Sequence, residues 1–441
     1  MNNVDLTKGK VMTVLLGLAL PIMGSSLLQF TYNLVDMLWI GHLGSNAVAS
    51  IGSSSFYISL GHSINALIVI GTGIKVAHSM GKNDIEGVKD YIHSGMALNV
   101  VIGAIYAMIL IVFGRSFINF LKLNNMEIEK EAYLYLAWSA PMLFFAFFNN
   151  LFSRIFASLG NTKSALKISA IGIIANIVLD PILIYIFNWG IIGAAIATLI
   201  ANVIMFVMYL NIGKAFLKFT IKKNIDFMKM KEIVRLGTPM AFQRILFTFI
   251  NIMLAKLIAS FGSEAVAAQK IGVQIESVTY MVTGGLNGAV ASFIGQNYGA
   301  KKYQRIQKGY QAAIGVGCAY AALSSVVFWV FPEQLAGLFV KEWDTITITA
   351  GYLRIIGYSQ VFNAMEMVTN GLLTGIGKPK IPSCVSVAFT ALRLPMAYVC
   401  VVHLGVEGIW WSITLSTILK GSVLVSVYLV KIKKQLVSNL T

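Results

Sequence analysis

Long apolar stretches recur along the whole chain, separated by short polar segments. A helix needs about 20 mainly apolar residues to cross a bilayer, and windows of this kind recur from one end to the other. They cover residues 11–40, 52–80, 91–113, 132–158, 164–187, 191–213, 233–260, 265–296, 308–331, 346–374, 381–402 and 406–430. The pattern predicts an all-α integral membrane protein with twelve transmembrane helices. The first stretch is too long for a cleaved signal sequence, so we expect it to be retained.

Composition supports this prediction. Asp, Glu, Lys and Arg make up 12% of the residues and 57% of the residues are apolar, whereas soluble proteins average about 25% charged residues. This composition argues against a soluble enzyme. The three cysteines, Cys318, Cys384 and Cys400, lie in apolar runs without metal-like spacing. We therefore expect neither a disulfide framework nor a zinc site.

The positive charges are distributed unevenly along the chain. Basic residues outnumber acidic ones by 34 to 18, a net charge of +16. The termini, the loops on their side of the membrane and the adjoining span ends hold 23 Lys and Arg, and the loops on the other side hold 4. Positive residues mark the cytoplasmic side, so we expect a multi-pass protein of the cell inner (cytoplasmic) membrane with both termini cytoplasmic. Nucleic acid is not needed as a partner to explain the charge.

The densest basic segment divides the chain into two halves of similar length. We predict an N-lobe at 1–213, a basic cytoplasmic linker at 214–232 and a C-lobe at 233–441. Each half holds six predicted spans, an even number, so both halves insert in the same orientation. The expected architecture is two six-helix bundles, related by a parallel repeat about the membrane normal, with a central cleft. Rocking one bundle against the other would open the cleft to either side in turn.

Sequence matches between the halves support the repeat. Leu18–Pro21 superposes on Leu236–Pro239, and Asn46–Ala49 on Glu264–Ala267. Gly81 falls on Gly299. Each match is weak alone, but their common order and their offset of about 218 residues indicate an internal repeat.

Several motifs carry a family resemblance. Ala19–Pro21 precedes Asp36–Gly44, the loop Gly295–Gly299 reads Gly-Gln-Asn-Tyr-Gly, and Asn176–Pro181 precedes Gly190–Thr198. Over essentially the whole chain the sequence resembles the multidrug and toxic compound extrusion (MATE) family of the MOP flippase superfamily. The resemblance implies a twelve-helix antiporter that expels organic, often cationic, compounds in exchange for protons or sodium ions.

Four acidic residues lie inside the predicted spans and away from the first residues of a span: Asp36, Asp180, Glu276 and Glu366. An ionised side chain at the bilayer centre costs about 2.5 to 3.5 kcal/mol on the more lenient scale, so each requires a reason. On the first span, Asp36 shares one helical face with three other polar residues, Gln29, Tyr32 and Asn33. We expect this stripe to face the bundle interior or the cleft.

The predicted topology brings several of the first-half polar residues to one depth. Asp36, Asp180 and Thr198 are expected roughly 7 to 10 Å beneath the outer boundary, and Asn176 lies one turn deeper than Asp180 on the same face. Oxygen ligands of this kind suit a proton or a small cation such as Na⁺. Two carboxylates at close range do not both ionise easily in a low dielectric, so we expect the pair to share a proton or hold a cation.

The resemblance adds roles to these residues. It implies that Asp36, Asn176, Asp180 and Thr198 form the cation site of the first lobe, with a backbone carbonyl at Ala194. Pro21 removes a backbone hydrogen bond in the first span and allows a hinge there. Our hypothesis is that cation binding at Asp36 and Asp180 alters this bend and weakens substrate binding. The alternative is that the polar residues only hold helices together.

The second half lacks the same cluster. The repeat places Leu254, Thr390, Leu394 and Ile413 where the first half has Asp36, Asn176, Asp180 and Thr198, so coupling is expected in the first lobe. Asn363 stands where some family members carry an aspartate, which argues against a second-lobe cation site of that type. Candidate substrate-cleft residues are Gln29, Tyr32, Asn33, Gln269, Glu276, Tyr280, Asn363 and Glu366. Alternatively, Glu276 and Glu366 pair with Arg244, Lys256 or Lys270. We expect Lys75 and Lys420 to extend toward lipid headgroups.

Taken together, the sequence favours a secondary active antiporter for organic, amphipathic cations or drugs, with H⁺ or Na⁺ as coupling ion and no cofactor. No GxxxxGK[ST] run is present, so ATP is not the expected energy source. A lipid-linked oligosaccharide flippase of the same superfamily is the alternative, and it should line its cleft with several Arg or Lys. A membrane-embedded enzyme is disfavoured because no clustered catalytic set appears. We expect a monomer in the lipid bilayer.

Overall fold

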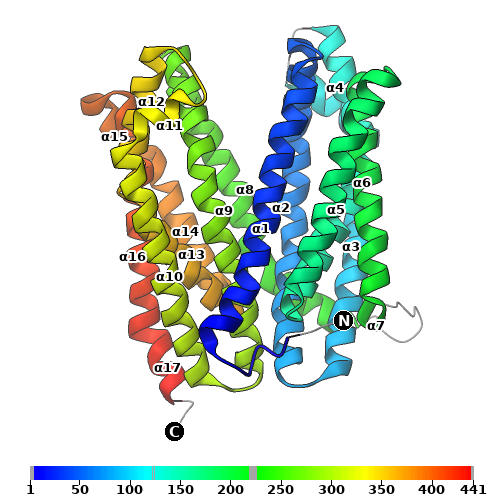
Figure 1. Ribbon diagram of the computed structural model, residues 1–441, viewed down its shortest axis with the longest axis vertical. Coiled ribbons are helices and arrows are strands. Elements are labelled where there is room, and N and C mark those ends of the chain that lie inside the picture. The colour runs from blue at the N-terminus through cyan, green and yellow to red at the C-terminus, as the bar shows by residue number, and fades with distance from the viewer. Residues whose placement is uncertain (1–3, 122, 124, 218–225, 439–441) are drawn as a thin grey trace. The chain divides into compact units, whose positions relative to one another are not determined.

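The protein folds into helices throughout the part of the chain that the structure describes (Figure 1). The structure is a computed structural model and describes residues 4–121, 123, 125–217 and 226–438. Part of the predicted linker 214–232 therefore lies outside the described residues. The first half contains α1 (Val11–Gly41), α2 (Ser45–Gly81), α3 (Ile85–Phe120), α4 (Met126–Ser158), α5 (Thr162–Pro181), the π-helix η1 (Ile182–Ile186), α6 (Gly190–Ile212) and the short α7 (Lys214–Leu217).

The second half repeats this order with more interruptions. It contains α8 (Phe227–Ala259), α9 (Ser263–Gly299), α10 (Tyr303–Val330), α11 (Pro332–Gly337), α12 (Trp343–Gly357), α13 (Gln360–Gly375), α14 (Lys380–Ala391), α15 (Arg393–Leu404), α16 (Val406–Val427), the π-helix η2 (Tyr428–Ile432) and α17 (Lys433–Ser438). Among the described residues, 10 helical stretches are long and apolar enough to cross a membrane. The two other predicted spans, 265–296 and 346–374, correspond to α9 and to α12 with α13, which carry several polar residues.

Two predicted spans are broken where we expected continuous helices. The span 346–374 is interrupted between Gly357 and Gln360, and the span 381–402 between Ala391 and Arg393. In the second case the reason is local, because Pro395 has no N–H to donate to the carbonyl of Ala391 and its ring crowds that carbonyl. Pro181 has a milder effect, since a π turn follows it in η1. Pro21 lies inside α1, which remains helical on both sides.

The internal repeat is visible in the backbone itself. Residues with positive φ come in pairs at the offset of about 218 residues or slightly less: Gly44 with Gly262, Asn83 with Lys301, Gly160 with Gly377, and Gly190 with Gly405. The angles agree closely, for example φ 103 at both Gly44 and Gly262 and φ 58 and 57 at Asn83 and Lys301. The two halves therefore turn the chain in the same way between equivalent helices.

Residue contacts divide the chain into two compact units that exchange short segments. Unit 1 contains Gly24–Ala241, and unit 2 contains Leu6–Met23 and Phe242–Thr441. Hence α1 begins in unit 2 and continues in unit 1, and α8 does the reverse. In both helices the change comes two residues after a proline, Pro21 or Pro239. At these segments the two units differ from the predicted lobes 1–213 and 233–441. That the lobes move as separate bodies stays a prediction.

Each unit has its own hydrophobic core. Unit 1 centres on aromatic residues of α4 and α6, including Phe148, Phe152 and Tyr209. In unit 2 the start of α1 packs with α9, α10 and α13 around Leu18, Phe293 and Leu372. The polar groups described below are therefore held by helices whose positions these cores fix.

Candidate functional site

The polar stripe of α1 meets α6 within unit 1. The hydroxyl groups of Tyr32 and Thr198 lie 3.3 Å apart, and Thr198 Oγ1 donates to the backbone carbonyl of Ala194 at 2.9 Å. Because the single hydroxyl proton of Thr198 is used in that bond, Tyr32 donates to Thr198. The Ala194 carbonyl, which the family resemblance implied as a ligand, thus already accepts a hydrogen bond. Tyr32, Thr198 and Ala194 form one connected group.

Asp180 lies at the C-terminal end of α5 and is fully buried, with 0% of its surface exposed. Its Oδ1 accepts a hydrogen bond from Asn176 Nδ2 at 3.1 Å, one helical turn earlier. Asp180 Oδ2 and Asn176 Oδ1 are buried and have no donor among the described residues. Two oxygen atoms are therefore available at this point of unit 1, one from a carboxylate and one from an amide.

Asp36 is half-buried on α1, one turn beyond Tyr32. Its carboxylate is close enough to that of Asp180 for the two charges to act on each other, and both charges act on the hydroxyl groups of Tyr32 and Tyr135. In the described part of the chain, neither Asp36 nor Asp180 forms an ion pair. The structure thus brings Asp36, Asn176, Asp180, Ala194 and Thr198 into one region of unit 1; their role in cation binding stays a prediction.

Residues that the sequence did not single out complete this region. The Tyr185 hydroxyl, on η1, donates to the backbone carbonyl of Trp39 on α1 at 2.5 Å, and the two rings meet edge to face. Deeper in the unit, Asn149 on α4 donates to the backbone and side-chain oxygens of Asn202 at 2.9 and 3.0 Å. Asn202 donates in turn to the Thr198 carbonyl. The spacing of four residues between Thr198 and Asn202 could have indicated from the sequence that they share a helix face. The position of Tyr185 could not be predicted in this way, because it depends on the π turn.

Of the remaining first-half candidates, two lie at the surface of unit 1. Gln29 and Asn33 are exposed, and Gln29 Nε2 lies 3.4 Å from Asn33 Oδ1. Pro21 is buried near the position at which α1 changes unit. The stripe on α1 therefore has an outward polar edge, Gln29 and Asn33, beside the inner edge formed by Tyr32 and Asp36.

In unit 2, Glu276 is buried and its hydrogen bonds are satisfied within the unit. Its carboxylate accepts from the Tyr352 hydroxyl at 2.7 Å and from Gln360 Nε2 at 3.2 Å. Tyr280, one turn away on α9, lies close enough for its hydroxyl group to influence that carboxylate. Gln269, two turns earlier, accepts from Trp410 Nε1 at 2.6 Å. The candidate cleft residues Glu276 and Gln269 thus form hydrogen bonds with other residues of unit 2.

Glu366 on α13 forms a buried ion pair with Lys420 on α16. The distance between Glu366 Oε2 and Lys420 Nζ is 3.0 Å, and each side chain is only 6% exposed. Ser386 Oγ donates to the other carboxylate oxygen at 2.9 Å. The expectation that Lys420 extends toward lipid headgroups is therefore wrong, because an acid on the adjacent helix holds it inside. Glu366 does form an ion pair, but not with Arg244, Lys256 or Lys270.

A second buried cation, Arg393, lies near enough to Glu276 for the two charges to act on each other. Arg393 begins α15 directly after the helix break and donates to Ser416 Oγ at 2.6 Å and Thr417 Oγ1 at 3.2 Å. The charges of Glu276 and Glu366 both act on its guanidinium group.

Asn363, buried on α13, has no hydrogen-bond partner for its amide nitrogen among the described residues. Lys75, in unit 1, pairs with Glu232 at 2.6 Å.

The second-half counterparts of the first-half cluster pack together as well. Leu254, Leu394 and Ile413 belong to a single hydrophobic cluster of unit 2. Under the repeat they correspond to Asp36, Asp180 and Thr198. The same place in the fold is therefore polar in one half and apolar in the other.

Comparison with known proteins agrees with this architecture. The sequence profile of the MatE family matches residues 21–182 and 239–399, which is most of the chain. The chain belongs to the MatE family. It is thus a MATE transporter of the MOP superfamily, a family of transporters rather than enzymes, and a multi-pass membrane protein.

Curated relatives match over most of their own length. The MATE transporter is 26% identical over 416 residues to the "Probable multidrug resistance protein NorM" of Thermotoga maritima, with 90% of this chain and 87% of the relative covered. It is 24% identical over 421 residues to the "Multidrug export protein MepA" of Staphylococcus aureus, with 93% and 91% covered.

Solved structures share the fold. A crystal structure described as "MATE in the bent conformation" superposes with a TM-score of 0.93 at 22% identity and covers 100% of both chains. A MOP superfamily transporter from Pyrococcus furiosus, described as having a binding pocket of reverse polarity, superposes with a TM-score of 0.92 at 21% identity, covering 100% of this chain and 99% of the other. The predicted all-α, twelve-helix, two-bundle fold is confirmed.

Proposed function

We propose that this MATE transporter is a secondary active antiporter that exports organic, amphipathic cations or drugs in exchange for H⁺ or Na⁺. The observation that carries the proposal is the Asp36–Asp180 pair, two acids of the membrane-spanning helices with no ion pair to either in the described chain. An uncompensated charge in a low-dielectric interior is costly. Uptake of a cation is the simplest way to remove that cost.

Exchange follows if both cations depend on the same negative charge. When H⁺ or Na⁺ neutralises the pair, an organic cation loses the attraction that holds it, and the reverse holds when the organic cation is bound first. The coupling ion and the organic cation then occupy the transporter alternately during one transport cycle. The relatives named as multidrug resistance and multidrug export proteins support organic compounds as the cargo.

The oxygen atoms in this region fit a small hard cation. Asp180 Oδ2, Asn176 Oδ1 and Asn149 Oδ1 are buried without donors among the described residues, and Thr198 and Asp36 lie in the same region. Carboxylate, amide and hydroxyl oxygens are the donors that Na⁺ accepts. A proton needs only one of the carboxylates, so the same set serves either ion.

The path of α1 supports the bending hypothesis. Residues up to Met23 pack in unit 2, while the part from Gly24 onward, including Asp36, packs in unit 1. Pro21 lies just before this change, where the helix lacks one backbone hydrogen bond. We propose that neutralising Asp36 alters how the later part of α1 packs in unit 1, and that the helix bends near Pro21.

For the substrate we assign a direct role to the outward edge of α1, Gln29 and Asn33, together with Tyr32 of the inner edge. This role is more direct than that of Glu276 and Glu366. Both glutamates have hydrogen-bond donors and buried cations around them. Their negative charge is therefore already stabilised within the unit and attracts a cationic ligand only weakly.

An inner-membrane location with cytoplasmic termini, a central cleft and a monomeric state remain part of the proposal.

A flippase for anionic lipid-linked sugars is the competing function. Unit 2 does bury two cations, Arg393 and Lys420. However, Lys420 is ion-paired to Glu366, and Arg393 lies in the field of both glutamates. These cations are therefore compensated inside the unit, which favours the antiporter.

The test is uptake of a fluorescent organic cation by vesicles that contain the purified full chain. A Na⁺ gradient and a pH gradient are imposed separately, and vesicles carrying the Asp180→Asn variant serve as the matched control. We expect one gradient to drive dye accumulation in the wild type and neither to do so in the variant. Dye movement under neither gradient, together with scrambling of a labelled lipid-linked sugar, would replace the antiporter with the flippase.

A further inference from the structure

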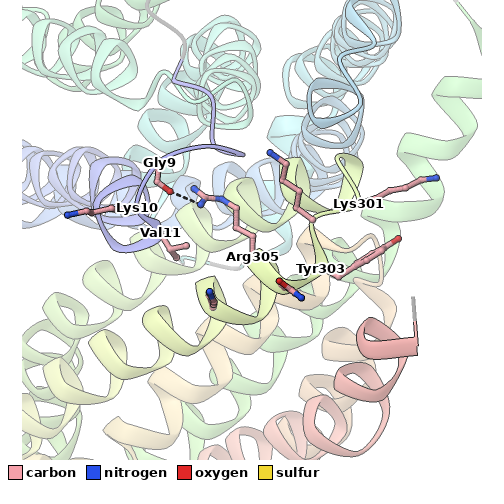
Figure 2. A pocket seen from close by; sticks show the side chains of 9 residues that line it. Gly9, Lys10, Val11, Lys301, Tyr303 and Arg305 are labelled. Carbon is pink, nitrogen blue, oxygen red and sulfur yellow. Dashed lines mark hydrogen bonds between the residues drawn. The ribbon is translucent and has the colours of Figure 1, made fainter. Parts of the chain in front are cut away.

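A basic pocket in unit 2 lies outside the site described above. It has a volume of about 500 Å³, within the range of small-ligand sites. Figure 2 shows that its walls come from the start of α1 with the residues before it, and from the start of α10. The lining residues are Gly9, Lys10, Val11, Lys301, Lys302, Tyr303, Gln304, Arg305 and Lys308. Five of these nine are basic, and none is acidic.

Two of the basic residues build the pocket wall. Arg305 donates to the carbonyls of Lys8 and Gly9 at 2.6 and 2.7 Å, the latter drawn in Figure 2. Lys302 Nζ donates to the Thr7 carbonyl at 2.8 Å. On the far side of this segment, Leu6 is buried and its backbone bonds to Gln296 and Asn297 of α9. The segment before α1 is therefore fixed in place, and the pocket is preformed.

The other three basic residues, Lys10, Lys301 and Lys308, are exposed and make no ion pair in the described part of the chain. Lys301 also has a positive φ of 57, a conformation that lysine adopts less readily than asparagine. Its counterpart in the first half, with the same turn, is Asn83. A lysine is thus kept at a position where the backbone would favour a different residue.

Comparison of the two halves through the internal repeat shows that this pocket lacks the acidic residues found at the equivalent place in unit 1. The equivalent place in unit 1 contains acids: Asp90 pairs with Lys229, and Asp84 caps α3 by accepting from the backbone N–H of Gly87 at 2.8 Å. The offset of about 218 residues converts Asp84 to Lys302, Asp90 to Lys308 and Lys229 to Val11. Unit 2 therefore keeps the geometry but replaces the carboxylates with cations.

We propose that this pocket binds the phosphate group of an anionic phospholipid headgroup, which supplies the negative charge that carboxylates supply in unit 1. Basic pockets at the cytoplasmic ends of membrane helices suit such headgroups, and the charge count assigns this end of the helices to the cytoplasm. The headgroup contacts Lys10, Lys301 and Lys308. Because the wall belongs to the segment before α1, bound lipid holds the start of α1 on unit 2.

The test measures lipid retention by the purified full chain. Protein is incubated with equal amounts of phosphatidylglycerol and phosphatidylcholine in detergent, and bound lipid is counted by native mass spectrometry. We compare the triple variant Lys10→Gln, Lys301→Gln, Lys308→Gln with a control, Lys82→Gln, Lys163→Gln, Lys167→Gln, which removes the same charge from exposed positions of unit 1. We expect the first triple variant to lose phosphatidylglycerol about tenfold or more and the control to retain it.

A second variant distinguishes a specific loss of lipid binding from misfolding of the first triple variant. Val11→Lys with Lys308→Asp recreates the Lys229–Asp90 pair that the chain already uses in unit 1, and it should also release phosphatidylglycerol while the melting temperature holds. Inorganic phosphate in a parallel arm should not displace the lipid. Equal retention by wild type and both pocket variants would overturn the proposal, and so would displacement of the lipid by millimolar phosphate alone.

Discussion

The two halves of the transporter place different chemistry at equivalent positions. Asp36, Asp180 and Thr198 lie together in unit 1, and their counterparts Leu254, Leu394 and Ile413 share one hydrophobic cluster in unit 2. Unit 2 shows that this place can be filled with apolar side chains and still fold. Helix packing therefore does not require acids there, which weighs against the idea that Asp36 and Asp180 only hold helices together.

A second contrast concerns how each half treats its buried acids. In unit 2, Glu366 has Lys420 at 3.0 Å, and Glu276 has two hydrogen-bond donors with Arg393 nearby. In unit 1, Asp180 has one donor, Asn176, and a free carboxylate oxygen in the described chain. Compensated acids contribute to a fixed structure, whereas uncompensated acids can take up and release a cation.

The largest expected effect comes from making unit 1 resemble unit 2 at this position. Asp180→Asn or Asp180→Leu, and likewise Asp36→Leu, should reduce gradient-driven dye transport by roughly 100-fold or more, since the attraction for the coupling cation is lost. The melting temperature should stay level or rise, because an uncompensated buried charge has been removed. Transport by the Leu variants at wild-type rates would show that the contrast between the halves has no functional meaning.

The next effect, on stability, should come from breaking the compensation in unit 2. Lys420→Met leaves Glu366 charged and unpaired in the interior, which should cost about 3 to 5 kcal/mol in the free energy of unfolding. The double variant Lys420→Met, Glu366→Gln should recover most of the loss and still couple dye transport to the gradient. Unfolding in detergent and vesicle uptake together check this. A double variant that folds but cannot couple would make the second-half pair part of the machinery.

A smaller effect is expected from Asn176→Leu, which keeps the side-chain volume but removes the donor to Asp180 Oδ1. A hydrogen bond to a charged group contributes about 1.5 to 3 kcal/mol, equivalent to a change of roughly ten- to hundredfold in an equilibrium constant. The half-saturating concentration of the coupling ion should shift by such a factor, with a smaller change in the maximal rate. An unchanged ion dependence would remove Asn176 from the site.

The smallest effect should follow from Tyr32→Phe, which removes the hydroxyl that meets Thr198 across α1 and α6. One such neutral bond contributes about 0.5 to 1.5 kcal/mol, so the half-saturating concentration of the coupling ion should change only a fewfold. Tyr280→Phe in unit 2 is the matched control, and it should leave the ion dependence as in the wild type. A larger effect at Tyr280 than at Tyr32 would reverse the assignment of the two halves.

The sequence predicted the parts of this protein that depend on local patterns. Apolar windows located the long helices, and the offset between the halves located the repeat that the paired turns at Gly44 and Gly262 display. The in-membrane acids could be found for the same reason, because a single charge stands out against an apolar background. The helix break before Arg393 was missed, although Pro395 gave a usable signal for it.

Only the tertiary structure decided which charges are compensated and which helices change unit. Lys420 reads as an ordinary lysine of a membrane helix, and its partner Glu366 lies 54 positions away in the sequence on another helix. The passage of α1 from unit 2 to unit 1 after Pro21 depends on contacts with helices far along the chain. Periodicity reports which face of a helix is polar, but pairing depends on which side chains meet across helices, and that is fixed by packing in three dimensions.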